Sequence, residues 1–262
     1  MRWSLLLLLA SFILAAPCRG EVVVETVAYT HDDVELTGTL AWDDAKKGRR
    51  PGVLVVHEWW GLDDYARGRA RQLAELGYVA FALDMYGTGR LTEHPSEAAQ
   101  WSSAIRQNVD NWRARAEAGL AILRANDQVD TDRLAAIGYC FGGATVLQLA
   151  YAGSGLNGVV SFHGALPAAD PAQAGQIDAK ILICHGADDG FVPEAQIDAF
   201  REPLDEVDAD YQIIYYAGAT HSFTNPGADD RGIDALRYNP SADRRSWQHM
   251  QMFFDEIFTS AP

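Results

Sequence analysis

The sequence is short of cysteine and of positive charge. It has three cysteines, and its 21 lysines and arginines stand against 36 aspartates and glutamates, for a formal net charge of -15. Three cysteines are too few for a disulfide framework, but a chain of 262 residues can bury a sizeable core without one. A strongly acidic protein repels nucleic acid and anionic lipid. We therefore expect no nucleic-acid partner.

Long apolar runs are also missing after the first 20 residues. Arg2 precedes an apolar run over residues 5–16, and small residues and a proline follow, which is the order of a secretory signal. We therefore expect residues 1–20 to be a signal peptide, cleaved near residue 20, and the protein to be periplasmic or secreted. The run is too short to span a bilayer comfortably, so no stable membrane insertion is expected after cleavage. An uncleaved anchor and a lipid-modified Cys18 remain the alternatives.

Short β-rich runs alternate with helical patterns over residues 21–262, the expected mature domain. This alternation is typical of βαβ units and a parallel sheet. We predict a single α/β domain with a mainly parallel central sheet, helices on both faces and antiparallel N-terminal strands. The expected strands cover residues 22–30, 34–42, 53–57, 78–83, 134–138, 159–162, 180–184 and 211–216. The expected helices cover residues 63–76, about 96–126, 142–152, 194–207 and 241–258.

The sharpest motif is GYCFGG at residues 138–143, between a predicted strand and a predicted helix. It has the pattern of a nucleophile elbow, with Cys140 in place of the usual serine. Glycines fit this strained turn because side chains would clash there. The turn also puts Cys140 at a helix N-terminus, where the helix dipole favours a thiolate. A buried cysteine in a glycine-rich turn is the structural alternative.

Two further motifs follow strands later in the chain. HGADDGFVP at residues 185–193 offers Asp188 and Asp189, and THSF at residues 220–223 offers His221. The order nucleophile, acid, histidine is that of α/β-hydrolases. The residues alone leave open which aspartate orients the histidine, since either one can simply cap the turn.

Together with VVHEWWG at residues 55–61, these motifs resemble the dienelactone hydrolase family of α/β-hydrolases, over about residues 30–260. The resemblance implies a carboxylic ester or lactone hydrolase with a Cys140-His221-Asp189 triad, a covalent acyl-cysteine and no cofactor. It selects Asp189 over Asp188. It also implies that Glu58 interacts with the resting thiol, and that the backbone N–H groups of Phe141 and Trp59 form the oxyanion hole.

The sequence departs from the family where substrate binds. The best-known members hold a substrate carboxylate with two arginines, one of them soon after an Asp-x-Tyr motif. Here Tyr86 ends that motif, Arg90 is displaced by two positions, and the second arginine position holds Asn225. We therefore expect neutral, fairly apolar esters or lactones to be preferred. His163, Phe191 and Phe223 complete the predicted pocket; the alternatives, a structural role for the histidine and core packing for the aromatics, remain open.

No metal site is expected, because His57-Glu58 lacks the spacing of a zinc helix. The expected partner is a small-molecule ester or lactone, and a monomer is favoured. The alternative function is a non-catalytic exported scaffold that binds a small molecule or a partner protein.

Overall fold

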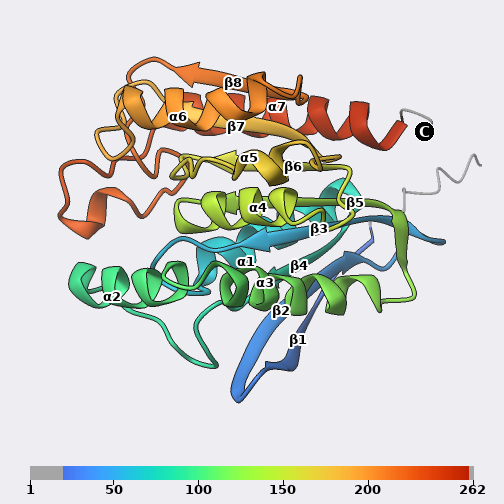
Figure 1. Ribbon diagram of the computed structural model, residues 1–262. Helices are drawn as coiled ribbons and strands as arrows, with labels where there is room; N and C mark the ends of the chain where they lie inside the picture. Colours follow the sequence, from blue (N-terminus) through green and yellow to red (C-terminus); the bar gives the residue numbers. More distant parts are fainter. Residues whose placement is uncertain (1–19, 260–262) are drawn as a thin grey trace, which may run out of the picture.

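The computed structural model describes residues 20–259, so the predicted signal segment lies outside the described residues except for Gly20. A single eight-stranded sheet forms the centre, in the order β1-β2-β4-β3-β5-β6-β7-β8 (Figure 1). Its strands are β1 (Val22–His31), β2 (Val34–Asp43), β3 (Arg50–Val56), β4 (Val79–Leu83), β5 (Val129–Tyr139), β6 (Gly158–Phe162), β7 (Lys180–Gly186) and β8 (Tyr211–Tyr216).

The direction of the strands confirms the predicted α/β class. β1 and β2 form an antiparallel hairpin, and β2 pairs antiparallel with β4. From β4 to β8 every neighbouring pair is parallel. β4 and β6 are buried along their whole length, as expected for strands covered on both faces, whereas β1 is partly exposed at the edge.

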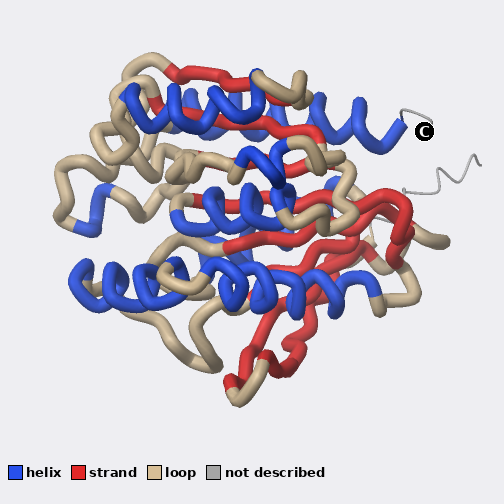
Figure 2. The backbone as a smooth tube through the Cα atoms, in the orientation of Figure 1, coloured by secondary structure: helices blue, strands red, loops and turns tan. Residues whose placement is uncertain are grey.

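Helices cover both faces of the sheet (Figure 2). On one face Leu54 and Val56 of β3 join the core beneath α3 and α4, and on the other Val53 and Val55 join the core beneath α1 and α7. The helices are α1 (Asp64–Leu76), α2 (Pro95–Arg106), α3 (Val109–Arg124), α4 (Phe141–Tyr151), α5 (Pro171–Ala174), α6 (Glu194–Asp205) and α7 (Pro240–Thr259).

The predicted helix over residues 96–126 is wrong in one respect, because it is two helices. α2 ends at Arg106 and α3 begins at Val109. Asn108 between them is extended, and its side chain accepts a hydrogen bond from the backbone N–H of Asn111, which makes it the N-cap of α3. Asparagine favours such caps over helix interiors. The short helix α5 was not predicted.

Within residues 20–259, no helix is both long and apolar enough to cross a membrane.

Candidate active site

The turn between β5 and α4 lifts Cys140 above the end of the sheet. Cys140 has φ 53° and ψ -113°, a conformation that L-residues rarely adopt, and α4 begins at the next residue. Strain of this kind persists only where the surrounding structure enforces it, and it gathers at functional sites. The geometry is that of the predicted nucleophile elbow.

Close backbone contacts explain the glycines around Cys140. A Cβ atom on Gly138 would lie 2.0 Å from the backbone oxygen of Gly142, and one on Gly142 would lie 2.2 Å from that of Val56. Backbone atoms cannot swing aside as a flexible side chain can. Glycine is therefore required at both positions for the elbow to pack against the end of β3.

Asp189 and His221 meet beside this elbow. The Nδ1 of His221 lies 2.8 Å from Oδ2 of Asp189, whose other oxygen accepts a hydrogen bond from the backbone N–H of Phe191 at 2.9 Å. Asp189 and His221 are buried, whereas Asp188 is exposed. The structure thus brings Asp189, and not Asp188, to the histidine, as the resemblance implied.

The electrostatics of these groups favour an ion pair. Burial alone would lower the pKa of His221, but the charge of Cys140 and hydrogen bonds with Asp189 and Cys140 outweigh it and hold that pKa well above its usual value. Burial would raise the pKa of Asp189, yet its hydrogen bond with His221 and the charge of that residue leave it lowered. These directions describe a protonated imidazole of His221 paired with the ionised carboxylate of Asp189.

Glu58 is held differently from what the resemblance implied. Its two carboxyl oxygens accept hydrogen bonds of 2.6 Å from Oγ of Ser222 and of 2.6 Å from Nδ2 of Asn225. Within residues 20–259 no hydrogen bond joins Glu58 to Cys140. Burial raises the pKa of this carboxyl, and the Ser222 hydrogen bond partly offsets the effect. Asn225 was predicted to bind substrate, but it is buried and its side chain donates a hydrogen bond to Glu58.

A cavity of about 210 Å³ opens at Cys140. Most of its walls are apolar, and Phe191 is half exposed at the surface. Two polar groups from α2 also line it, namely Ser102 and the exposed guanidinium of Arg106. The lining residues are Trp59, Ser102, Arg106, Cys140, Phe141, Ala165, Phe191, Val192, His221 and Leu236. This size and lining suit a small, largely apolar acyl group.

Besides Asn225, four more residues predicted to bind substrate do not line this cavity. Tyr86, His163 and Phe223 are buried side chains that pack against aromatic neighbours. The guanidinium of Arg90 lies 5.8 Å from the centre of the Trp101 ring. Phe191 lines the cavity as predicted. Ser102 and Arg106 were not predicted to line it, because one continuous helix over residues 96–126 gave no reason to bring them to the site.

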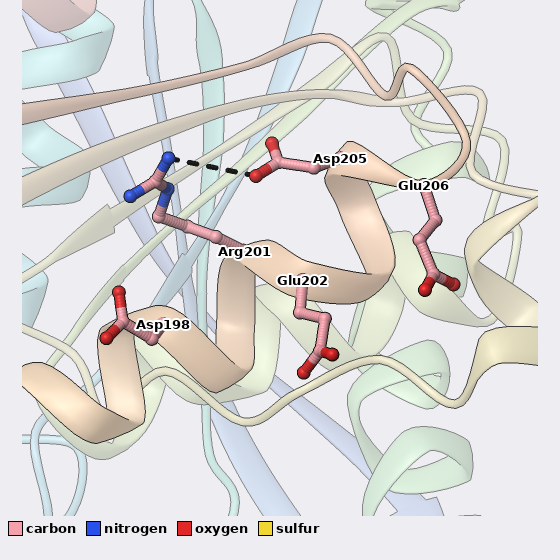
Figure 3. A pocket seen from close by; sticks show the side chains of 5 residues that line it. All are labelled: Asp198, Arg201, Glu202, Asp205 and Glu206. Atoms are coloured by element: carbon pink, nitrogen blue, oxygen red, sulfur yellow. Dashed lines mark ion pairs between the residues drawn. The ribbon is translucent and has the colours of Figure 1, made fainter.

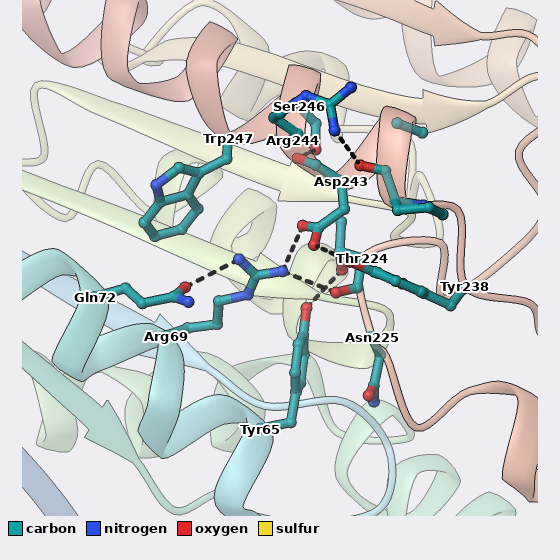
Figure 4. A network of polar contacts seen from close by, with 12 residues as sticks. Tyr65, Arg69, Gln72, Thr224, Asn225, Tyr238, Asp243, Arg244, Ser246 and Trp247 are labelled. Atoms are coloured by element: carbon teal, nitrogen blue, oxygen red, sulfur yellow. Dashed lines mark hydrogen bonds and ion pairs between the residues drawn. The ribbon is translucent and has the colours of Figure 1, made fainter.

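The loop that carries His221 is anchored by side chains of α1 and α7 (Figure 4). Arg69 of α1 donates a hydrogen bond of 2.8 Å to the backbone oxygen of Thr224 and pairs with Asp243 of α7 at 2.5 Å. The Thr224 hydroxyl also bonds Tyr65 at 2.5 Å and His163 at 2.7 Å. These bonds fix the backbone three residues after His221, so they restrict where that histidine can lie.

A second hollow lies along α6 and its C-terminal cap (Figure 3). All five of its side chains are exposed, four are acidic, and Arg201 pairs with Asp205 at 3.7 Å. The lining residues are Asp198, Arg201, Glu202, Asp205 and Glu206. Solvated surface charges of this kind are poor catalysts, so this hollow lacks the buried, paired groups found at the Cys140 cavity. No cluster of three histidine, cysteine or acidic side chains suited to a metal ion occurs in the described part of the chain.

Comparison with known proteins identifies a family. The model of the dienelactone hydrolase family matches residues 36–258. The solved structure of m3DLH is 42% identical, with a TM-score of 0.88, and the match covers 91% of this chain and 99% of that one. A dienelactone hydrolase-like promiscuous phosphotriesterase from metagenomic libraries is 39% identical, with a TM-score of 0.88 and the same coverage of both chains.

Curated relatives agree at lower identity. A protein of Yersinia pestis named "Putative carboxymethylenebutenolidase" is 27% identical over 236 residues, which cover 87% of this chain and 86% of that protein. Similarity therefore extends over nearly the whole described fold and includes the segments that carry Cys140, Asp189 and His221.

Proposed function

Because this chain belongs to the dienelactone hydrolase family and is a carboxylic ester or lactone hydrolase, we propose that its nucleophile is Cys140, with His221 as base and acid and Asp189 as the orienting carboxylate. The observation that carries the proposal is the buried Asp189–His221 pair beside the strained Cys140 turn. A non-catalytic scaffold, the alternative function, has no need of a buried acid–histidine pair beside a strained cysteine turn, a combination typical of active sites.

The reaction follows from these positions. The Cys140 thiolate attacks the ester carbonyl, and the carbonyl oxygen becomes an oxyanion stabilised by the N–H groups of Phe141 and Trp59. The C–O bond then breaks, His221 protonates the leaving alkoxide, and an acyl-cysteine remains. Water gives a proton to His221 and attacks the thioester, which releases the carboxylic acid and restores the thiolate. For a lactone, the alcohol and acid leave as one molecule.

The acyl-cysteine can be detected directly. Rapid acid quenching during turnover of a p-nitrophenyl ester should yield protein heavier by one acyl group, and peptide mapping should place that group on Cys140. An adduct on another side chain, or none under conditions of rapid acylation, would contradict the proposed nucleophile.

The cavity favours neutral substrates. Asn225 is bound to Glu58 and Arg90 does not line the cavity, so neither predicted arginine position supplies a carboxylate clamp. Arg106 is the one arginine or lysine in the cavity wall, its hydrogen bonds go only to Ser102, and no carboxylate of the described residues forms an ion pair with it. A single exposed guanidinium does not replace two buried ones, since solvent screens it.

We predict that a neutral methyl ester is hydrolysed with higher kcat/KM than the same molecule bearing a free carboxylate. Arg106→Gln should lower kcat/KM for the carboxylated compound a further three- to tenfold, roughly the value of one partly screened charged contact. It should change the neutral ester less than twofold. Arg90→Gln is the matched control and should alter neither. Preference of the wild type for the free acid would refute the proposed selectivity.

A second candidate activity is the hydrolysis of phosphotriesters, as the name of one similar structure suggests. A neutral triester offers a phosphorus atom to the same thiolate and a phosphoryl oxygen to the same N–H donors. Turnover of a dialkyl aryl phosphate that disappears in Cys140→Ala would support it, whereas a single equivalent of released phenol would indicate inactivation by a stable adduct.

We also propose that the protein is exported, on the basis of the signal-like residues 1–20. The mature chain should begin between Arg19 and Val22, since Gly20 offers the small residue that cleavage requires. N-terminal sequencing of protein recovered from outside the cytoplasm checks this prediction. A sequence that starts at Met1 would favour an uncleaved anchor.

A further inference from the structure

His57 is a buried histidine at the end of β3, and the proposed reaction assigns it no role. Its side chain is fully buried, and it lies directly before Glu58 and Trp59. Of the two ring nitrogens, Nε2 lies 3.2 Å from the backbone nitrogen of Met85, and Nδ1 lies 2.5 Å from the backbone oxygen of Glu58. Both polar atoms of the ring are therefore used within the protein.

These two partners determine the tautomer. The Met85 nitrogen is a backbone donor, so Nε2 must accept with its lone pair. The proton of a neutral imidazole then sits on Nδ1, which donates it to the Glu58 oxygen, an atom that can only accept. Burial lowers the pKa of His57, and the bond to Glu58 opposes it only in part. The ring is thus held neutral, with its single N–H aimed at one carbonyl.

That carbonyl belongs to the peptide group between Glu58 and Trp59. The group is planar and trans, so its C=O and the Trp59 N–H point in opposite directions. His57 and, at 3.4 Å, the Gly61 N–H hold the carbonyl on one side. The Trp59 N–H on the other side finds no acceptor among residues 20–259.

The residue that bears this N–H lies at the cavity beside Cys140. Trp59 lines the cavity together with Cys140 and Phe141. The carbonyls of Val56 and His57 lie so close to the first turn of α4 that they would meet a Cβ atom on Gly142 at 2.2 and 2.7 Å. The backbone of residues 56–57, directly before the Glu58–Trp59 peptide, is therefore in contact with the elbow.

Aromatic packing fixes the imidazole in turn. Its centre lies 5.0 Å from that of Tyr86, edge to face, and 6.0 Å from that of Phe141, in a stacked arrangement. The ring thus packs on the residue that bears one proposed oxyanion donor and hydrogen-bonds the peptide that bears the other. Tyr86, predicted to bind substrate, supports this ring from the core.

We propose that His57 is a positioning residue for the oxyanion hole: as a neutral Nδ1–H tautomer it locks the Glu58–Trp59 peptide so that the Trp59 N–H faces the oxygen of the tetrahedral intermediate. The inference rests on the proposed function, since it requires attack by Cys140. Loss of one oxyanion donor costs about 10²–10³ in kcat. A donor that is present but no longer held should cost less.

The test compares two reactions of the same thiol. Acylation by a p-nitrophenyl ester creates an oxyanion, whereas alkylation by iodoacetamide displaces iodide and creates none. In His57→Leu, the acylation rate should fall about ten- to a hundredfold with KM changed less than threefold, while alkylation of Cys140 stays within twofold of wild type. His57→Gln should recover much of the acylation rate, because its amide can accept from Met85 and donate to Glu58.

His249→Leu is the matched control, since this histidine of α7 bonds the Tyr216 hydroxyl through Nδ1 at 2.7 Å, and both rates should be unchanged. Equal losses in acylation and alkylation, or no loss in acylation, would overturn the proposal. If His57→Leu does not fold, ¹⁵N-histidine NMR of the wild type decides: a proton on Nε2 of His57 would refute it. Failure of the proposed function is seen earlier, as wild-type protein that forms no acyl-Cys140.

Discussion

Replacing Cys140 by alanine is expected to lower kcat/KM for p-nitrophenyl esters at least about 10³-fold, the scale of losing a covalent nucleophile. The expected loss is chemical, because alanine keeps the side chain's Cβ in the strained turn and removes only the sulfur. Initial rates of p-nitrophenol release measure it, and thermal unfolding confirms that the variant is folded.

Cys184→Ala is the matched control for that experiment. Cys184 is buried in β7, its sulfur lies 3.6 Å from the Tyr216 hydroxyl, and burial raises its pKa to about 12. A thiol in this environment is inert near neutral pH. Activity should therefore stay within a few-fold of wild type. Cys140→Ala with activity within tenfold of wild type would refute the cysteine mechanism.

Asp189→Asn is expected to lower kcat about 10²- to 10⁴-fold, since only a carboxylate both orients the imidazole and stabilises the imidazolium. Asp188→Asn, which changes the exposed neighbour in the same way, should stay within about twofold. The two variants make the same chemical change at two adjacent residues. If Asp188→Asn were the more damaging, the assignment of the orienting acid would be wrong.

Asp189→Asn should also change the pKa of His221. The hydrogen bond and charge of Asp189 help to hold the pKa of His221 above its usual value, because they favour the protonated ring. Removing the negative charge takes away that support, so the pKa of His221 should fall. NMR titration of the His221 ring protons in wild type and Asp189→Asn measures the direction. An unchanged or higher pKa would show that Asp189 does not act on this histidine.

The parts of the site that the sequence predicted are those written in short contiguous motifs. The Cys140 elbow needs glycines at fixed offsets, and His221 follows the last strand. Each can therefore be recognised from a short stretch of sequence. The choice of Asp189 over Asp188 came from the family resemblance, and the structure agrees through the 2.8 Å contact with His221.

The features of the site that the sequence did not predict depend on how segments distant in the chain meet in the fold. Arg106 reaches the cavity because α2 ends at this residue and α3 begins as a separate helix. The helical spacing of apolar residues continues across this break, so the sequence pattern does not reveal it. Asparagine favours helix N-caps, so Asn108 indicated a new helix start, and the predicted continuous helix ignored it. The Asn225–Glu58 bond joins residues 167 apart and has no local signature.

The anchoring of the His221 loop separates two kinds of evolutionary change. Arg69 and Asp243, which hold the loop, belong to helices on one face of the sheet. Ser102 and Arg106, which shape the cavity, belong to α2 on the other side. Substitutions that widen, narrow or recharge the cavity through α2 can therefore accumulate without loosening the catalytic base. We therefore expect a library of variants confined to α2 to change substrate preference with little loss of turnover.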